Sequence, residues 1–316
     1  MSAEPFRIQG PALISFSGGR TSAYMLRLIL DANGGMLAAD VHVVFANTGK
    51  ERPETLQFVH EVETRWLVKI HWVEWRATPR RAEGTASLAA WLAENDRDRA
   101  MVDPRGFAVV GHNSACGNGE PFEALIAMKQ RLPNWQERWC TEFLKVAPIT
   151  ALAASFGWGP GEYLEVIGLR DDEGHRVLKA LENANFRWDR KTNALVPRDP
   201  PRQVRFPLAS AKLTKAHVMA FWADQPFDLG LKPHEGNCDL CFMKGRKIRK
   251  RLIRDVPGIA RWWNRQETIR DQFFDRRDRV AQLIAEVQRS PEMWEASEEG
   301  EHDVECGLHC APMEAA

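Results

Sequence analysis

The stretch PALISFSGGRTS, residues 11–22, decides the fold of this chain. Its first half is a short apolar run that predicts a buried β-strand, and its second half is rich in glycine and hydroxyl side chains. Apolar side chains then recur at helical spacing, at Met25, Leu26, Ile29 and Leu30. The stretch therefore predicts a strand, a glycine loop and a helix in succession.

The loop itself consists of Ser17, Gly18, Gly19, Arg20, Thr21 and Ser22. Glycines let the backbone approach a ligand, and the N-terminus of the following helix offers unpaired N–H groups and a partial positive charge. These features predict an anion site for phosphate or sulfate. The alternative is a tight turn in which a Ser or Thr caps the helix. The loop is neither a Walker A motif nor a GxGxxG motif, since the lysine and the glycine spacing are absent.

Three more apolar runs, at residues 41–46, 69–75 and 163–168, predict further strands of the same sheet. A helix is predicted to begin near Pro53, because proline is tolerated in the first turn of a helix. Repeated strand–loop–helix units favour an α/β fold, in the form of a Rossmann-like parallel sheet with helices on both faces.

The chain is expected to divide into three parts. Residues 1–243 form the α/β domain, with helical insertions near 76–135 and 182–204; prolines in the second insertion predict irregular backbone. Residues 244–289 form a basic helical region. Residues 290–316 hold eight acidic side chains and no Lys or Arg, which predicts a mobile tail.

The composition is that of an ordinary globular protein. Of 316 residues, 44% are apolar and 27% are charged, and 43 Lys plus Arg balance 43 Asp plus Glu, which argues against a chain-wide polycation. There is no N-terminal secretory pattern and no run of about 18 apolar residues, so we expect a cytoplasmic protein without a membrane span. Six cysteines are too few for a disulfide scaffold, so a close pair is expected to bind metal or catalyse.

Six motifs between residues 13 and 309 resemble those of one enzyme family. This family comprises the reductases of phosphoadenosine phosphosulfate (PAPS) and adenylyl sulfate (APS), in the PP-loop superfamily of adenine nucleotide alpha hydrolase-like proteins. The matching segments are SGGRTS for the pyrophosphate loop, 45–56 for DTG…PET, 139–148 for C…KxxP, 167–170 with Arg176 for GLR, 236–241 for the CxxC of iron–sulfur APS reductases, and 305–309 for ECGLH.

The resemblance implies an enzyme that reduces an adenylyl-sulfate-type nucleotide to sulfite. Cys306 would attack the sulfur of the phosphosulfate anhydride and form an S-sulfocysteine, from which a thioredoxin-like thiol donor would release sulfite. His309 of the same motif is the implied proton donor. The implied nucleotide- and sulfate-binding residues are the loop 17–22 together with Asn47, Thr48, Gly49, Lys145, Gly168, Arg170 and Arg176.

The chemistry of Cys306 requires a thiolate, and a thiol with a pKa of ~8.5 is mostly protonated at neutral pH. Carboxylates around it in the tail would raise that pKa further. Cys306 is therefore a good nucleophile only when the tail folds over a cationic site. The alternative is a disordered tail without a catalytic role, in which His309 is also solvated. Arg170 and Arg176 are likewise either anion ligands or surface ion-pair partners.

Cys238 and Cys241 have CxxC spacing, which lets two sulfurs converge on one metal centre. With Cys140, the resemblance implies a [4Fe–4S] cluster held by three cysteines. The fourth place falls to Cys116, to Cys310 or to an exogenous ligand, or it stays open for substrate sulfur. Zinc is the competing metal, and three buried thiols without metal are the remaining alternative.

Two residues depart from the family pattern. Thr21 stands where many PP-loop enzymes carry an acidic residue, which weakens the case for ATP and Mg²⁺. Trp139 stands where the APS reductases carry the first of two adjacent cysteines, so one cluster ligand of that pattern is missing.

Two other functions stay open beside reduction. One is an ATP-dependent PP-loop sulfur transferase that thiolates a nucleobase or a nucleic acid; an open iron and the basic residues 244–254 motivate it. The alternative for this basic segment is the solvated side of an amphipathic helix. The other function is a non-catalytic nucleotide-binding or redox-sensing iron–sulfur protein that has the fold without the chemistry.

Overall fold

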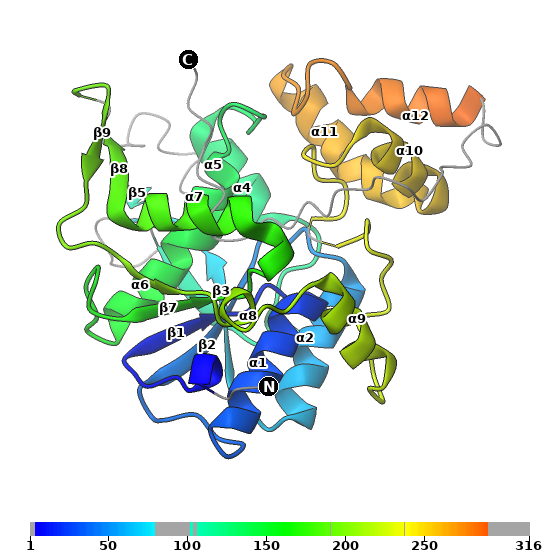
Figure 1. The fold of residues 1–316 in the computed structure, drawn as a ribbon. Coiled ribbons are helices and arrows are strands. Elements are labelled where there is room, and N and C mark those ends of the chain that lie inside the picture. Colours follow the sequence, from blue (N-terminus) through cyan, green and yellow to red (C-terminus); the bar gives the residue numbers. More distant parts are fainter. Residues whose placement is uncertain (1–3, 80–101, 104–105, 190, 237, 290–316) are drawn as a thin grey trace.

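The structure, a computed structural model, describes residues 4–79, 102–103, 106–189, 191–236 and 238–289. Its centre is a six-stranded sheet in the order β10-β7-β1-β2-β3-β6 (Figure 1). Neighbouring strands run parallel except β3 and β6, which are antiparallel. The strands are β1 (Ala12–Ser15), β2 (Val41–Asn47), β3 (Ile70–Trp75), β6 (Phe107–Val110), β7 (Leu164–Ile167) and β10 (Gln203–Arg205).

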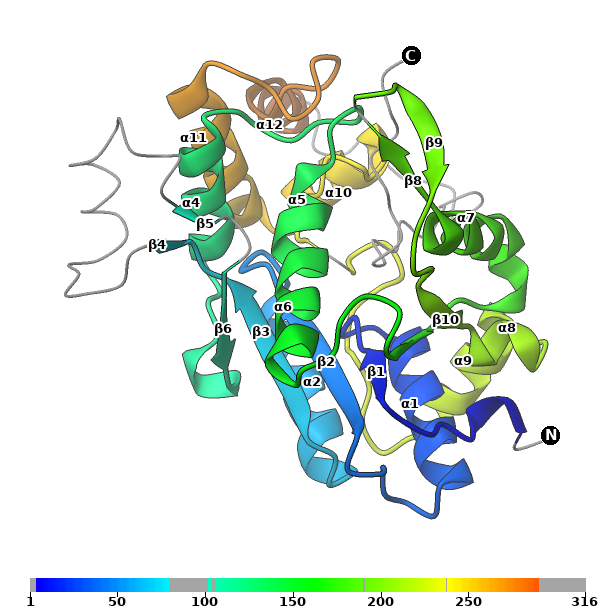
Figure 2. The same cartoon turned by 90° about the vertical axis from the view of Figure 1, so that its left-hand side faces the viewer.

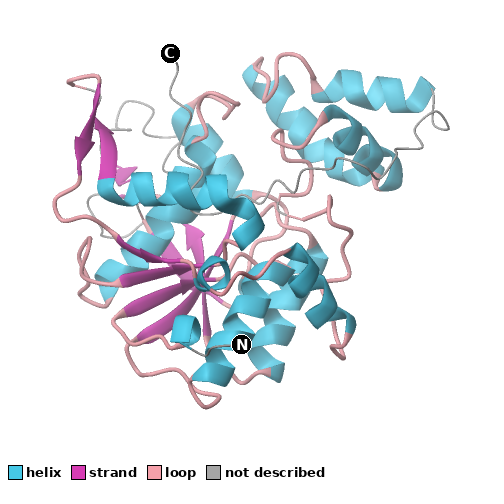
Figure 3. Cartoon of the chain, in the orientation of Figure 1, coloured by secondary structure: helices cyan, strands magenta, loops and turns pink. Residues whose placement is uncertain are grey.

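The expected α/β fold is confirmed, with a mixed rather than a purely parallel sheet because of β6. Helices flank the sheet on both faces (Figure 3). On one face lie α1 (Arg20–Ala32), α2 (Pro53–Arg65) and α9 (Lys215–Ala223), and on the other lies α6 (Ala147–Ser155). The helix expected near Pro53 thus begins at that residue.

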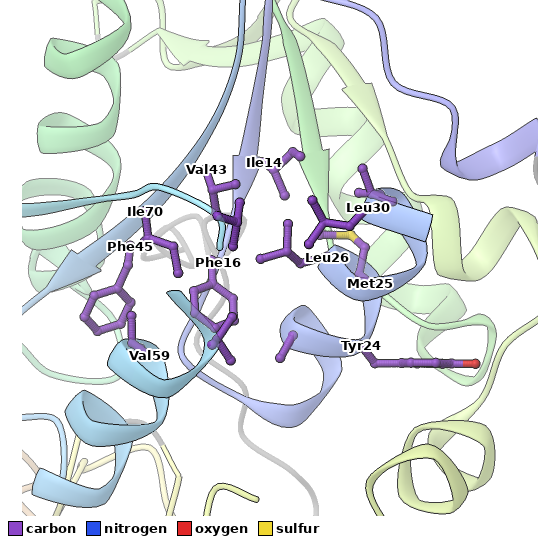
Figure 4. Close-up of a cluster of buried hydrophobic side chains, with 14 of the residues drawn as sticks. Ile14, Phe16, Tyr24, Met25, Leu26, Leu30, Val43, Phe45, Val59 and Ile70 are labelled. Carbon is purple, nitrogen blue, oxygen red and sulfur yellow. The ribbon is translucent and has the colours of Figure 1, made fainter. Parts of the chain in front are cut away.

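Side chains of the central strands alternate between the two faces, as the period of a strand requires. Ile14 of β1 and Val43 of β2 lie in one cluster with Met25 of α1 (Figure 4). Leu13, the residue before Ile14 in β1, packs with Leu152 of α6 in a separate cluster on the opposite face. A strand buried on both faces needs apolar residues at every position, which is why the sequence shows continuous apolar runs.

A second core lies beyond the carboxyl ends of the strands (Figure 2). It joins α4 (Glu120–Lys129) to α10 (Arg246–Asp255), α11 (Ala260–Arg270) and α12 (Val280–Arg289). Trp263 of α11 is buried at its centre, and its ring lies 5.9 Å from that of Phe122 in α4. Helices from an insertion and from the basic region therefore share one core.

The insertion at 182–204 is more regular than its prolines suggested. The helix α7 (Gly174–Asn185) leads into a hairpin of β8 (Phe186–Asp189) and β9 (Ala194–Pro197), and the chain then returns to the main sheet as β10. The prediction of irregular backbone is wrong for β8, β9 and β10. It holds only for the connection around Pro200 and Pro201, which links β9 to β10.

Short elements complete the described chain, and none of its helices is long and apolar enough to cross a membrane. A three-residue α5 (Trp139–Thr141), a π-helical turn η4 (Glu142–Val146) and α6 form one helical column (Figure 2). The others are η1 (Glu4–Phe6), β4 (Thr78–Pro79), β5 (Val102–Asp103), η3 (His112–Ser114), η5 (Asp171–Glu173), α8 (Pro207–Ser210) and η6 (Pro257–Ile259).

Candidate nucleotide pocket and cysteine cavity

The strand order makes the ends of β1 and β7 a branch point of the sheet. From β1 the chain continues through β2 and β3 on one side, whereas β7 and β10 lie on the other side of β1. In open parallel sheets, ligands bind in the crevice outside the carboxyl ends of the strands at such a point. The glycine loop follows β1 and Arg170 follows β7, so the two predicted anion-binding segments meet there.

Gly18 is required by the conformation of the glycine loop. Its φ is +76°, and a Cβ atom there would lie 2.8 Å from Cγ2 of Thr55. The backbone N–H of Ser17 donates to Oγ of Ser22 at 3.2 Å and closes the loop. Gly168, at the end of β7, has a packing role, because a Cβ atom there would lie 3.3 Å from Cα of Ser22. The loop thus presents the N-terminus of α1 at the crevice, where backbone N–H groups suit an anion.

A pocket with a strong positive charge lies over this loop. Its lining includes five Lys or Arg side chains and, among the described residues, no carboxylate. Val218, Met219 and Leu229 add an apolar wall. Cations beside an apolar wall suit a phosphorylated ligand that also carries a flat organic base. The five cations are Arg20, Arg170, Lys215, Lys232 and Lys244.

Two of these arginines also hold the pocket together. Arg20 donates through Nε to Asp228 at 2.6 Å and so ties the loop to the opposite wall. Arg170 is buried; its Nη1 donates to Oγ1 of Thr21 at 2.9 Å, and its Nε donates to the Asp172 carboxylate at 3.0 Å, which offsets part of its charge. Thr21, at the position where many PP-loop enzymes carry an acid, is therefore the acceptor for a pocket arginine.

Lys244 lies between the pocket and the cysteines. Its side chain is 3% exposed and lines the pocket, while its Nζ lies 3.3 Å from the carbonyl oxygen of Asp239. Burial lowers the pKa of Lys244, whereas the neighbouring Cys241 and Cys238 act in the opposite direction. The Lys244 ammonium group therefore interacts electrostatically both with an anion in the pocket and with negative charge on Cys238 and Cys241.

The three cysteines proposed as metal ligands line one small cavity. Cys140, Cys238 and Cys241 meet there with Lys145. The cavity has a volume of about 20 Å³, which leaves room for about one water molecule. Its apolar wall is formed by Phe122, Leu144, Phe242, Met243 and Trp263.

The segment directly after β2 holds the CxxC loop in place. Glu51 and Cys238 form an isolated antiparallel bridge, and the N–H of Asp239 donates to the carbonyl of Lys50 at 2.8 Å. The Lys50 ammonium also lies 2.9 Å from the Asp239 carboxylate and 5.1 Å from the centre of the Trp262 ring. Contacts between distant parts of the chain thus position this cysteine pair.

Cys140 reaches the cavity from α5, just before the π-helical turn. Pro148 has no N–H to donate to the carbonyl of Leu144, which favours a wider turn at Glu142–Val146. Lys145 lies within that turn and lines the cavity. The C…KxxP segment therefore places its cysteine and its lysine beside the CxxC loop.

The environment of Cys238 opposes ionisation of its thiol. Burial and the Glu51 carboxylate raise the pKa of Cys238 well above its ordinary value, although Lys145 acts in the opposite direction. Oγ1 of Thr48 lies 3.6 Å from its sulfur. Such a thiol is a poor nucleophile, so a ligand or packing role suits Cys238 better than attack on a substrate.

The chemistry of the donor set fits a thiolate-bound metal, because three thiols suit an iron–sulfur cluster or zinc. Room for about one water molecule suits a single ion, and a four-iron cluster requires the cavity to widen. Trp139 adds no ligand, since its ring packs 6.1 Å from that of Phe122. Within the described part of the chain, no three His, Cys, Asp or Glu side chains already have metal-binding geometry. Ligation therefore requires the three cysteine side chains to turn toward a common centre.

Comparison with known proteins identifies the N-terminal part of the chain. Residues 11–101 match the family model of the phosphoadenosine phosphosulfate reductase domain. This part of the chain is therefore similar to the PAPS reductase domain.

Two relatives and one solved structure extend the comparison. The chain is 28% identical over 252 residues to the uncharacterized nin region protein ORF290 of Escherichia phage lambda, a match that covers 80% of this chain and 72% of that protein. An uncharacterized protein of Methanocaldococcus jannaschii is 42% identical over 64 residues, which is 20% of this chain and 12% of that protein. The crystal structure of PAPS reductase from Candida auris in a phosphate complex aligns with a TM-score of 0.34 and 14% identity, over 70% of this chain and 78% of that chain.

The predicted binding residues of the PAPS reductase-like domain fall in different places. Ser17, Gly18, Gly19, Arg20, Thr21 and Arg170 line the pocket, and Thr48 and Lys145 line the cysteine cavity. Ser22 and Gly168 do not line the pocket but contact the glycine loop and the start of α1.

Three further predicted residues have partners of their own. Asn47 donates to Glu74 at 2.7 Å, Arg176 forms an ion pair with Glu173, and a Cβ atom on Gly49 would lie 2.7 Å from Cδ of Pro121.

The remaining cysteines of the prediction are not in the cavity. Cys116 lies beside Glu74, whose Oε1 accepts its backbone N–H at 2.6 Å. Burial and that carboxylate raise the pKa of the Cys116 thiol to about 12. Cys306, His309 and Cys310 lie outside the described residues.

Four charged or titratable pocket residues were not predicted from the sequence: Lys215, Lys232, His234 and Lys244. One pattern points to two of them, since residues 231–236 (LKPHEG) place a lysine and a histidine among proline and glycine directly before the CxxC loop. Lys215 had no such pattern, because it is the first residue of an ordinary capped helix.

Most cations of the basic segment 244–254 have acidic partners within the chain. Arg249 of α10 is buried and pairs with Asp275 at 3.2 Å and with Asp278 at 2.7 Å. Lys250 pairs with Glu286 of α12 at 2.5 Å. These pairs join α10 to the second core, whereas Lys247 is exposed, so the segment is less available to nucleic acid than its sequence suggests.

Proposed function

We propose that this protein reduces an adenylyl-sulfate-type nucleotide, PAPS or APS, and releases sulfite. The observation that carries the proposal is the pocket at the β1–β7 branch point, with five cations and no carboxylate among its described lining residues. Such a lining neutralises phosphate and sulfate oxygens directly, whereas ATP chemistry commonly uses carboxylates that hold Mg²⁺. The match of residues 11–101 to the PAPS reductase domain model supports the same substrate class.

The proposed reaction passes through an S-sulfonate on Cys306. Its thiolate attacks the sulfur of the nucleotide; an S–S bond forms while the bond from sulfur to the bridging phosphate oxygen breaks, and the nucleotide leaves with that oxygen and the electron pair. A dithiol donor of the thioredoxin type then attacks Sγ of Cys306 and displaces sulfite. The second donor thiol resolves the mixed disulfide, so the donor leaves oxidised and supplies two electrons. His309 is the proposed proton donor.

The cations of the pocket would serve the departing phosphate. Negative charge develops there as the bond to sulfur breaks, and preorganised cations stabilise such charge most where water is excluded. Arg170 and Lys244 suit this role because both are buried and both line the pocket. A positive pocket would also lower the pKa of Cys306 when the tail approaches it.

We further propose that Cys140, Cys238 and Cys241 hold a [4Fe–4S] cluster, with zinc as the competing metal. When bound, the metal centre would hold the three cysteines as thiolates and supply a Lewis-acidic metal next to the pocket. Anaerobically purified protein should contain iron and acid-labile sulfide and show a visible absorption band. Stoichiometric zinc without iron would show that the site binds zinc rather than a cluster. Protein without any metal would contradict this part of the proposal.

The function is tested by single turnover with PAPS and with APS. Without a thiol donor, metal-replete protein should gain one SO₃ adduct on Cys306, and a thioredoxin-type dithiol should then release sulfite. Cys306→Ser should form no adduct, and Cys116→Ser, whose residue lies beside Glu74 outside the cavity, should behave like the wild type as the control. Absence of both adduct and sulfite, together with turnover of ATP, would establish the sulfur transferase in place of the reductase. Binding of the nucleotide without any turnover would indicate a non-catalytic protein.

A further inference from the structure

One surface combines exposed apolar side chains with surplus positive charge. It is formed by α7 and the β8–β9 hairpin, and we call it the ribbon surface. Figure 1 shows the hairpin standing clear of the central sheet, on the side away from α10–α12. Of eleven large apolar side chains exposed in the described chain, five lie on this surface, so the concentration is local. They are Leu178, Leu181, Phe186, Trp188 and Leu195.

The helix α7 is packed with its small side chains inward. Ala180 and Ala184 are buried, at 0% and 1% exposure, whereas Leu178 is 70% exposed and Leu181 is 40% exposed. Ala180 packs with Ile167 of β7 in the cluster at that edge of the sheet. A helix that only needed to cover the sheet would bury its leucines, so the outward leucines serve something other than the fold.

The hairpin presents an aromatic face. Trp188 pairs with Leu195 and Phe186 pairs with Pro197, and residues two apart on a strand share a face. These four side chains therefore lie on one face of a two-stranded ribbon, and all four are exposed. The base of the ribbon is held elsewhere, by Arg198, whose Nε donates to the carbonyl of Asn183 at 2.8 Å. Phe186 is 39% exposed and Trp188 is 38% exposed, so each ring leaves part of its surface open to solvent.

Surplus positive charge surrounds this face. Residues 174–189 and 191–205 contain seven Lys or Arg against three Asp or Glu, although the whole chain has zero formal net charge. Arg187 and Lys191 of the hairpin are exposed. Burial lowers the pKa of Arg198, and repulsion from Arg202 and Arg187 lowers it further. Arg202 is paired with Glu165 at the base of the ribbon, so Arg187 and Lys191 are the exposed cations among the described residues of the hairpin.

We propose that the ribbon surface binds single-stranded nucleic acid. Exposed aromatic rings accept unpaired bases by stacking, and neighbouring cations bind the phosphates. Phe186 and Trp188 would supply the stacking platform. Arg187 lies between them in sequence and on the opposite face of the ribbon, so it would contact phosphates from the ribbon edge, together with Lys191 of the turn. The two strands lie only about 5 Å apart, so long cationic side chains reach the edge along which a nucleic-acid backbone would run. The proposal goes beyond nucleotide reduction and does not depend on it.

The test is fluorescence anisotropy of a labelled oligo(dT) of about 20 nucleotides, titrated with the full chain at several salt concentrations. Wild-type protein should bind, and its affinity should fall steeply with salt. Trp188→Ala should weaken binding at least ~10-fold, as loss of one stacked base predicts. Arg187→Glu with Lys191→Glu should also weaken binding, and should reduce the slope of log K against log salt by ~1.4.

Two control variants match these changes on another surface. Ile269→Ala removes an exposed apolar side chain of α11, and Arg261→Glu reverses an exposed charge there; both should bind oligo(dT) within about twofold of the wild type. Saturating ATP should leave binding intact, which separates the ribbon surface from the nucleotide pocket. Circular dichroism melting of each variant should match the wild type, because the changed side chains are exposed.

Three results would overturn the proposal. The first is no binding of single-stranded DNA or RNA at micromolar protein. The second is binding that is displaced by ATP or that survives the ribbon variants. The third is concentration-dependent self-association that Trp188→Ala abolishes while nucleic acid stays unbound, since the ribbon surface would then be a contact between protein chains.

Discussion

The nucleotide pocket and the cysteine cavity adjoin each other at the carboxyl edge of the sheet, yet they are built in opposite ways. The pocket is lined by cations, and its floor is one contiguous loop at residues 17–21. The cavity is small and apolar, and its three cysteines come from two segments that are distant in sequence. In the described part of the chain, Lys244 lines the pocket and also interacts with the thiols of Cys238 and Cys241. Anion binding and thiol chemistry therefore have separate electrostatic environments, which can be changed one at a time.

The largest effect is expected from Gly18→Val. A side chain at this left-handed position adds backbone strain and meets Cγ2 of Thr55 at 2.8 Å, so the loop must deform. Affinity for APS in calorimetry should fall at least ~100-fold, since an anion site depends on the aligned loop N–H groups.

The matched control is Gly19→Ala, where the nearest atom to a new Cβ is Oγ of Ser17 at 3.6 Å. It should keep the affinity within about threefold. Equal losses in both variants would mean that the loop is not the anion site.

The next effect belongs to the cavity alone. Cys238→Ser should lower the metal content at least ~10-fold and leave the affinity for APS within about threefold, because the lost ligand lies outside the pocket lining. Cys116→Ser is the control and should retain the metal, since its thiol lies beside Glu74. Metal analysis and calorimetry measure the two properties. A cluster that survives Cys238→Ser would separate the CxxC motif from metal binding.

Lys244→Met should affect both sites. Loss of the buried cation should weaken APS binding ~10-fold, and it should slow alkylation of Cys241 at pH 8, because the neighbouring positive charge favours the thiolate. Lys232→Met changes an exposed lysine that lines only the pocket, so it should weaken binding and leave the alkylation rate unchanged. Identical behaviour of the two variants would show that the pocket and the cavity are not coupled through Lys244.

The smallest effect lies at the opposite edge of the sheet. Burial, His42 and Lys69 lower the pKa of His71 to about 4, from an ordinary value near 6.5. Between these values the unfolded chain binds the proton and the folded chain does not, so stability falls as pH drops from about 6.5 to about 4. With partial exposure the loss is on the order of 1 kcal/mol.

His71→Gln should flatten this part of the curve of unfolding free energy against pH in urea titrations, with no change in APS affinity or metal content. A change in either would show that the two sites depend on the amino edge of the sheet. An unchanged pH dependence would place the acid sensitivity in another group.

Much of the nucleotide pocket was predictable because it is local. The strand, the glycine loop and α1 follow one another within residues 11–32, and a loop that needs a left-handed residue at position 18 needs glycine there. The other cations of the pocket were not predictable in this way. Lys215 begins α9 and Lys244 lies in the turn before α10, and these elements reach the pocket only through packing against the sheet and the second core.

Two basic segments also show that ion pairs between distant residues could not be predicted from the sequence. In the sequence, residues 244–254 looked the more suitable for a polyanion, whereas residues 182–204 looked irregular. In the structure, most cations of the first segment pair with acids such as Asp275, Asp278 and Glu286. In the second segment Arg202 pairs with Glu165, whereas Arg187 and Lys191 are exposed. Net local charge depends on which acids fold against a segment, and a one-dimensional pattern does not contain that information.

The sequence by itself determined the α/β fold, the place of the glycine loop and the CxxC spacing, because each depends on residues only a few positions apart. The tertiary structure alone decided that Lys145 joins the cysteines, that Asn47 and Arg176 have partners within the fold, and that Lys244 links the pocket to the cavity. The physical reason is range: backbone conformation and hydrophobic period act along the chain, whereas electrostatic pairing and burial act across space.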